Sequence, residues 1–172
     1  EDGNLYIMFA EKALAINPVN TDLRFNLGLK YLRVGKNDLA VYHYKKYLII
    51  EEWSGSLNNI AVGYSRLGMK VKEAYYLEKA ISKKDDTLSF ANISKKYLDE
   101  GFTNIAERLL IEADELSKKG IKVHENIGLR KKELNKIIED EDKKDKEIID
   151  LAEKIHKFKV RQDSPSTSHI LT

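Results

Sequence analysis

Apolar residues recur every three or four positions through most of the chain, as they do along one face of an α-helix. Between residues 21 and 34, for example, Leu23, Leu27, Tyr31 and Val34 follow this spacing. No stretch of the sequence sustains the alternation of apolar and polar residues that is typical of a half-buried strand. Only two prolines interrupt the 172 residues. The pattern therefore predicts an all-α protein.

The helical pattern repeats with a period of 33 residues. Three tyrosines and three glycines recur at this interval: Tyr31, Tyr64 and Tyr97, and Gly35, Gly68 and Gly101. A fixed period of this length is typical of solenoids, in which each repeat is one supersecondary unit that buries its apolar face against its neighbours. The sequence predicts three such units, at about 21–53, 54–86 and 87–119.

Each repeat is expected to contain two helices joined at its glycine. In the first repeat, Gly35 ends one helical pattern, and Asn37 or Asp38 is placed to accept hydrogen bonds from the free N–H groups of the next helix. The segment from Gly101 to Asn104 has the same design. We therefore predict an antiparallel helix pair in each repeat, with Asn or Asp as the cap of the second helix.

Small and aromatic residues occupy characteristic places within the repeat. The first repeat has Leu27, Gly28, Tyr31, Gly35, Ala40, Tyr44 and Tyr47, and the third has Tyr97, Gly101, Ala106, Leu110 and Ala113. This arrangement resembles the tetratricopeptide repeat, which implies a right-handed superhelix of antiparallel helix pairs. The segment 1–20, which ends near Pro18, resembles the second helix of a preceding repeat. The second repeat departs from the family pattern, because Glu73 stands where the family has a small residue.

The C-terminal third lacks the repeat signature. Residues 129–162 contain neither glycine nor proline, which favours one long helix over about 120–161, its first half capping the repeats and its second half projecting. Four apolar residues of this helix lie at heptad spacing: Ile148, Leu151, Ile155 and Phe158. They make the helix a candidate for pairing with a partner or a second copy. The alternative is that this part of the helix folds back onto the repeats. Residues 162–172 are expected to form a flexible tail, within which Ile170 and Leu171 are candidates to dock in a groove.

Composition excludes several classes of function. The 30 Lys and Arg against 28 Asp and Glu give a net charge of +2, which provides no strong field for nucleic acid or a membrane surface. With no cysteine and four dispersed histidines, we expect neither a metal site nor a cofactor. No nucleophile motif or phosphate-binding loop is present, so we expect no enzyme. No apolar run is long enough to span a membrane, and the compartment stays open.

The expected function is therefore protein or peptide binding. Solenoids of this kind bind partners on the concave face, which the first helix of each repeat lines. Eight first-helix residues are candidates for partner contacts: Asn26, Asn59, Asn92, Arg33, Arg66, Phe25, Leu29 and Lys95. By analogy with the family, the three asparagines form a ladder able to bind a peptide backbone, while the alternative is that each bonds a neighbouring helix.

Two versions of this function stay open, a scaffold that assembles a larger complex and a peptide-binding adaptor or co-chaperone. Some members of the family bind a C-terminal carboxylate through Lys and Asn at positions where this chain has Phe25 and Leu29. A ligand with apolar side chains is therefore expected instead. Of the aromatic residues outside the predicted core, Tyr42, Trp53, Tyr75 and Tyr76 are candidates for a second contact surface. A nucleic-acid-binding repeat is the less favoured rival, since acidic residues interrupt the pairs of lysines.

Overall fold

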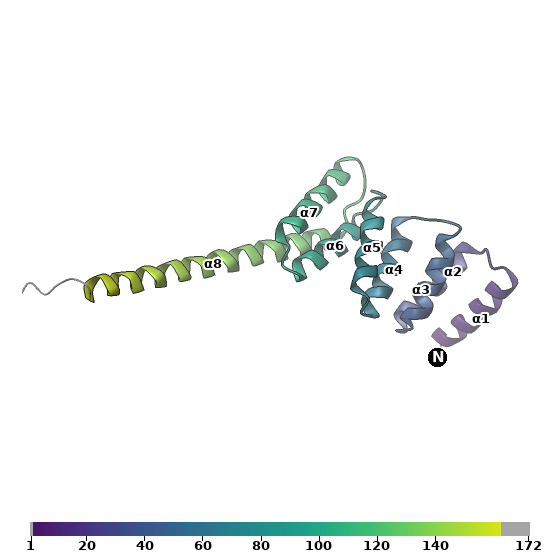
Figure 1. The fold of residues 1–172 in the computed structure, drawn as a ribbon. Helices are drawn as coiled ribbons and strands as arrows, with labels where there is room; N and C mark the ends of the chain where they lie inside the picture. The colour runs from purple at the N-terminus through teal and green to yellow at the C-terminus, as the bar shows by residue number, and fades with distance from the viewer. Residues whose placement is uncertain (1, 163–172) are drawn as a thin grey trace, which may run out of the picture. The chain divides into compact units, whose positions relative to one another are not determined.

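The computed structural model of the chain describes residues 2–162, which are almost entirely helical (Figure 1). Eight helices occupy this range: α1 (Asp2–Ile16), α2 (Thr21–Arg33), α3 (Asn37–Leu48), α4 (Ser54–Arg66), α5 (Lys70–Ile81), α6 (Leu88–Asp99), α7 (Thr103–Lys118) and α8 (Glu125–Gln162). The described residues contain no strand. The prediction of an all-α protein with a long C-terminal helix is confirmed. The docking proposed for Ile170 and Leu171 lies outside the described residues.

Helices α2 to α7 form three successive pairs. Within each pair the two helices pack together, and α3 and α5 also pack against the first helix of the pair that follows. Helix α1 packs against α2 in the same way (Figure 1). Consecutive packing of this kind builds the predicted solenoid, because each pair buries its apolar face on its neighbours.

The repeat glycines close the turn between the two helices of each pair. Gly35 has a φ of 77°, which favours glycine because it has no Cβ. Its N–H donates to the carbonyl of Leu32 at 3.2 Å, and the next N–H donates to the carbonyl of Tyr31 at 3.0 Å. This is the Schellman arrangement, which satisfies carbonyls at the end of a helix. Gly68, Gly101 and Gly120 adopt the same conformation and bonds.

The prediction that an Asn or Asp side chain caps the second helix at these turns is wrong. Helix α3 begins at Asn37, its capping position is Lys36, and no side chain caps it. Helix α7 likewise begins after Phe102 without a side-chain cap. The glycine turn reverses the chain within two residues, so the polar residues already lie inside the helix. The Oδ1 atom of Asn37 is buried without a hydrogen-bond partner in the described structure.

The repeat positions form the core of the helix pairs. Leu27, Ala40 and Tyr44 are fully buried, and Tyr31 and Tyr64 are nearly so. The third repeated tyrosine, Tyr97, is only half-buried, so the repeated position packs in the core in the first two repeats but not fully in the third. Burial of such large rings removes much apolar surface from water and is a major source of stability.

A partly buried polar cluster ties α1 to the first helix pair. The Tyr31 hydroxyl donates to Glu11 Oε1 at 2.6 Å, and His43 Nε2 lies 3.0 Å from the same oxygen. The rings of Tyr31 and His43 stack, with centroids 5.4 Å apart. These contacts join three helices at one carboxylate, so α1 is held by a specific interaction as well as by apolar packing.

The chain divides into two compact units, Glu1–Lys131 and Lys132–Thr172. In the first unit, the beginning of α8 contributes Ile127, which is fully buried, and Lys131 forms an ion pair with Asp114 of α7. In the second unit, α8 continues without a break as far as Gln162. None of the helices in the described range combines the length and the apolar character needed to cross a bilayer.

Candidate partner-binding site

Three hollows lie along the first helices of the repeats, and together they contain all eight residues that the sequence predicts for partner contacts. We call them the α1–α2 hollow, the apolar hollow and the charged hollow, in chain order. Asn26, Leu29 and Arg33 line the first, Phe25 and Asn59 the second, and Arg66, Asn92 and Lys95 the third.

The α1–α2 hollow has a volume of about 420 Å³. Tyr6 of α1 forms one side, and Asn26, Leu29, Lys30 and Arg33 of α2 form the other. Asn26 and Arg33 are exposed. The hollow therefore offers a carboxamide and two cations beside one aromatic ring.

The apolar hollow has a volume of about 370 Å³ and lies at the N-terminal ends of α2, α4 and α6. Phe25, Trp53, Leu88 and Val123 supply its apolar surface. Phe25 is held by its ring contacts, with its centroid 5.6 Å from that of Trp53. Large side chains fixed by their neighbours form a pocket that loses little entropy when an apolar group enters.

A loop between α7 and α8 closes one side of the apolar hollow. The Thr87 hydroxyl donates to the carbonyl of Lys122 at 3.2 Å and accepts from the N–H of His124 at 2.7 Å. Thr87 is almost fully buried. One side chain therefore fixes two backbone groups of this loop and positions Val123 in the hollow. The sequence gives no signal for this contact, because the loop has no repeat counterpart.

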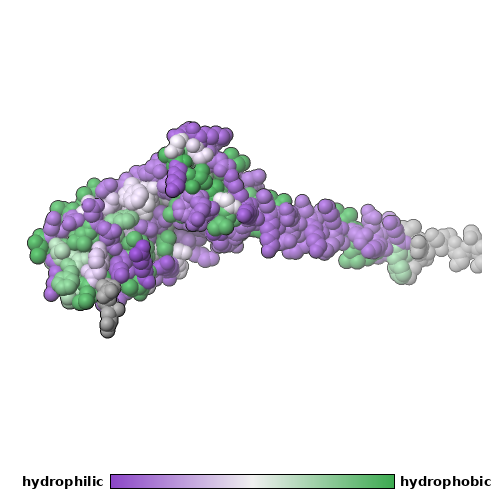
Figure 2. Space-filling model, turned by 180° about the vertical axis from the view of Figure 1, so that it is seen from behind, coloured by the Kyte–Doolittle hydropathy of each residue, from purple (hydrophilic) through white to green (hydrophobic). Residues whose placement is uncertain are grey.

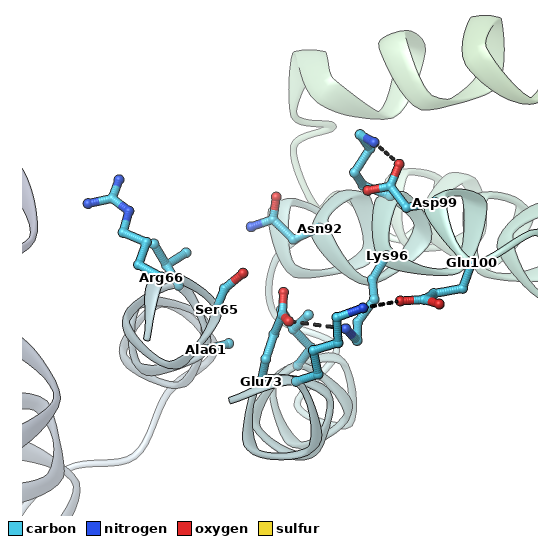
Figure 3. Close-up of a pocket in the computed structure, with 12 residues that line it drawn as sticks. Ala61, Ser65, Arg66, Glu73, Asn92, Lys96, Asp99 and Glu100 are labelled. Atoms are coloured by element: carbon cyan, nitrogen blue, oxygen red, sulfur yellow. Dashed lines mark hydrogen bonds and ion pairs between the residues drawn. The ribbon is translucent and has the colours of Figure 1, made fainter. Parts of the chain in front are cut away.

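The charged hollow has a volume of about 460 Å³ and lies between α4, α5 and α6 (Figure 3). Three ion pairs line it: Lys96 with Glu73 at 3.1 Å, Lys70 with Glu100 at 3.0 Å, and Lys95 with Asp99. Cations and anions alternate, so the hollow suits a ligand that carries both charges or exposes its backbone.

The ion pair of Lys70 and Glu100 favours the charged form of both residues. The hydrogen bond from Lys70 lowers the pKa of the Glu100 carboxyl, and the same bond raises the pKa of Lys70. Both groups keep their charges near neutral pH.

Two carboxamides join the apolar and charged hollows. Asn92, which lines the charged hollow, donates through Nδ2 to Oδ1 of Asn58 at 2.7 Å, and Asn58 lines the apolar hollow. Figure 3 shows Asn92 pointing from α6 into the gap that faces α4. Asn58 does not follow the repeat period and was not predicted. Its neighbour Asn59 carried the repeat signal, whereas the geometry brings Asn58 to Asn92.

The three repeated asparagines are not equivalent. Asn59 donates through Nδ2 to the hydroxyl of the buried Tyr44 at 3.0 Å, and Asn92 donates to Asn58. These are bonds to neighbouring helices, as the alternative interpretation expected for each asparagine. Within the described residues no such bond is found for Asn26, which is exposed in the α1–α2 hollow. Burial raises the pKa of the Tyr44 hydroxyl, so it stays protonated.

The two candidate arginines also differ. Arg66 donates through its guanidinium to the carbonyl of Leu32 at 2.6 Å, at the end of α2. That bond satisfies a helix-terminal carbonyl and links the first two repeats. Arg33 is exposed on α2. Within the described residues, no hydrogen bond of this kind is found for Arg33.

A further hollow, which the repeat pattern did not indicate, opens between α5 and α6. It has a volume of about 500 Å³ and is lined by Val71, Tyr75, Tyr97 and Phe102, among others. It shares three residues with the charged hollow: Lys70, Lys96 and Glu100. Of the four aromatic residues named for a second surface, Tyr42, Trp53 and Tyr75 are exposed and Tyr76 is half-buried.

The candidate helix-pairing residues of α8 are all open to solvent. Ile148, Leu151, Ile155 and Phe158 expose between 49% and 65% of their surface. Figure 2 shows hydrophilic residues along the middle of this helix and hydrophobic ones close to its C-terminal end. Exposed apolar residues gathered in this way are typical of interaction surfaces.

Two crystal structures of MamA resemble this chain. One is 20% identical, with a TM-score of 0.59, and the match covers 81% of this chain and 89% of that one. The other is 17% identical, with a TM-score of 0.61, and the match covers 99% of this chain and 89% of that one. Likeness at this level of identity shows the helical-repeat fold alone. The sequence matches no protein-family model and no curated protein.

Proposed function

We propose that the chain is a non-catalytic protein-interaction module of the tetratricopeptide type, acting as a scaffold in the assembly of a larger complex. The observation that carries this proposal is the placement of all eight candidate residues in hollows along α2, α4 and α6. First helices are the partner-binding elements of helical solenoids. The exposed apolar residues of α8 offer a second surface for assembly.

The apolar and charged hollows together suit an extended segment of a partner. An apolar side chain of that segment would enter between Phe25, Trp53 and Leu88. The half-buried carboxamide of Asn92, held by the buried Asn58, would lie beside its backbone. Mixed charges in the adjoining hollow would then receive polar side chains. This complementarity also favours the second candidate function, a peptide-binding adaptor.

A nucleic-acid ligand is less favoured by the charge distribution. The lysines that stand in pairs in the sequence mostly contact carboxylates: Lys83 pairs with Glu52, Lys84 with Glu112, and Lys118 with Glu115. Neutralised in this way, they do not form a continuous cationic track. A protein ligand should therefore lose little affinity with added salt, whereas a nucleic acid would lose it steeply.

Selection of short random peptides displayed on phage tests the proposal. Enriched peptides are then titrated against the wild-type chain and against Leu88→Ala and Asn92→Ala, with Tyr75→Ala in the α5–α6 hollow as the matched control. We expect the selected peptides to carry an aromatic or long aliphatic residue. Leu88→Ala and Asn92→Ala should each bind them about tenfold more weakly than the wild-type chain does.

Three results would count against peptide binding in the apolar and charged hollows. They are equal binding by all variants, loss only in the Tyr75→Ala control, and enrichment of no peptide family at all. Circular dichroism of each variant confirms that a loss of affinity is not a loss of fold.

A further inference from the structure

The apolar stripe of α8 has a defined geometry. Ile148 and Ile155 are seven residues apart, as are Leu151 and Phe158, and the two sets are offset by three. This is the a and d spacing of a coiled coil, in which each side chain inserts between residues of the facing helix. We call these four residues the α8 seam. Their exposure shows that no described part of this chain covers them.

We propose that the α8 seam binds the α8 seam of a second copy, with the two helices antiparallel. The inference rests on α8 alone and does not depend on the function proposed for the hollows. In this arrangement Ile148 faces Phe158 of the other copy, and Leu151 faces Ile155. The contact is symmetric, so one patch serves both copies and the assembly closes as a dimer.

Charges beside the seam decide the orientation. Antiparallel helices bring residues of the g position together, which places Glu147 of each copy opposite Lys154 of the other. Symmetry gives two such attractive contacts. At the other flank, Ala152 faces Lys159, which adds no repulsion. Glu147 and Lys154 are both exposed on α8. Their ion-pair partners in the single chain, Lys143 and Asp150, lie on the same helix.

The parallel alternative is disfavoured by the same residues. There, a g residue of one helix faces an e residue of the next heptad in the other. Lys154 would face Lys159, and this repulsion would occur twice. Glu147 would face Ala152 and gain nothing. The charge pattern therefore selects the antiparallel dimer over the parallel one.

The length of the seam limits the strength of the contact. Glu141 and Lys144 occupy the a and d positions that precede Ile148, so the apolar core cannot extend upstream. Two heptads are fewer than a stable coiled coil usually needs. A weak dimer, in exchange with the monomer, is the expected state.

Sedimentation velocity over a range of protein concentrations tests the proposal through charge reversal. Glu147→Lys and Lys154→Glu should each weaken self-association by about tenfold, because each turns two attractions into repulsions. An equimolar mixture of the two variants should associate again, since each then faces the opposite charge. Lys157→Glu, the same reversal on the outer face of the helix, is the matched control and should leave association unchanged.

Cysteine cross-linking gives an independent measurement, since the chain has no cysteine of its own. Leu151→Cys and Ile155→Cys should form a disulfide between copies when mixed, and neither should do so alone.

Several outcomes overturn the proposal. Tighter association of Lys154→Glu would show the parallel dimer, because that change pairs it with Lys159. A wild-type chain that stays monomeric at every concentration, or equal association of all variants, would show that a different partner or surface is used.

Discussion

The carboxylate of Glu73 lies 3.1 Å from Nζ of Lys96, and both side chains are less than 20% exposed. One repeat earlier, the equivalent positions hold Ala40 and Gly63. There the helices are in close contact, since a Cβ on Gly63 would lie 2.6 Å from a methyl group of Val41. Between α5 and α6, an ion pair takes the place of two small residues. The charged hollow and the α5–α6 hollow adjoin this pair.

A double-mutant cycle on Glu73→Ala and Lys96→Ala should show coupling. We expect a coupling free energy of about 1 kcal/mol in the unfolding free energy, because the pair is largely shielded from water. The exposed Lys70–Glu100 pair is the matched control and should couple less. Denaturant unfolding of the single and double variants measures both cycles. Additive effects at Glu73 and Lys96 would show that the pair fills space without holding the repeats together.

The same substitution should have opposite effects at two glycines. A Cβ on Gly28 would lie 2.9 Å from the ring of the fully buried Tyr44, whereas at Gly128 of α8 nothing lies within 4 Å. We expect Gly28→Ala to lower the unfolding free energy by about 1 to 2 kcal/mol, because the ring must move. Gly128→Ala should raise it by up to about 1 kcal/mol through helix propensity. Thermal and denaturant unfolding report both changes, and a stabilising Gly28→Ala would contradict the packing described here.

Stability should fall in mild acid because of His43. Burial lowers the pKa of its imidazole, and the nearby Glu11 carboxylate only partly opposes this effect. Its Nδ1 is buried without a partner in the described structure, which suits the neutral ring. The unfolded chain therefore binds a proton more readily than the folded one. The stability that the neutral His43 ring contributes is complete above about pH 6.5, the ordinary pKa of histidine. It is lost as the pH falls through the lowered pKa of the folded state.

His43→Gln isolates this effect. We expect its unfolding free energy to vary less than that of the wild-type chain between neutral pH and mild acid. His156→Gln, on the exposed part of α8, is the matched control and should follow the wild-type curve. Parallel curves for wild type and His43→Gln would mean that another group is responsible.

Features that depend on local spacing could be predicted from the sequence. The repeated Tyr31 and Gly35 identified the core position and the turn, because a helix period and a glycine-specific conformation leave direct traces in a sequence. The capping role expected of Asn37 was wrong for a local reason as well. The backbone bonds of the glycine turn start the next helix at that residue, and a side-chain cap needs a position one residue earlier.

Contacts between helices could not be predicted in the same way. The Asn92–Asn58 bond depends on the distance between α4 and α6, and the repeat period points to Asn59 instead. The Thr87 contacts depend on the path of a loop without a repeat counterpart. The sequence thus identified residues of all three hollows, but neither the boundaries between the hollows nor the side chains that connect them.

The most direct measurement of groove binding uses Trp53, the single tryptophan of the chain, which lines the apolar hollow and exposes 40% of its surface. Its emission is recorded while a peptide enriched by selection is added to the wild-type chain and to Leu88→Ala. If a partner segment enters this hollow, the emission should shift to shorter wavelength as the indole loses water, with a midpoint that Leu88→Ala moves about tenfold higher. A peptide that binds tightly while Trp53 emission stays unchanged would place the binding surface elsewhere and contradict binding in the apolar hollow.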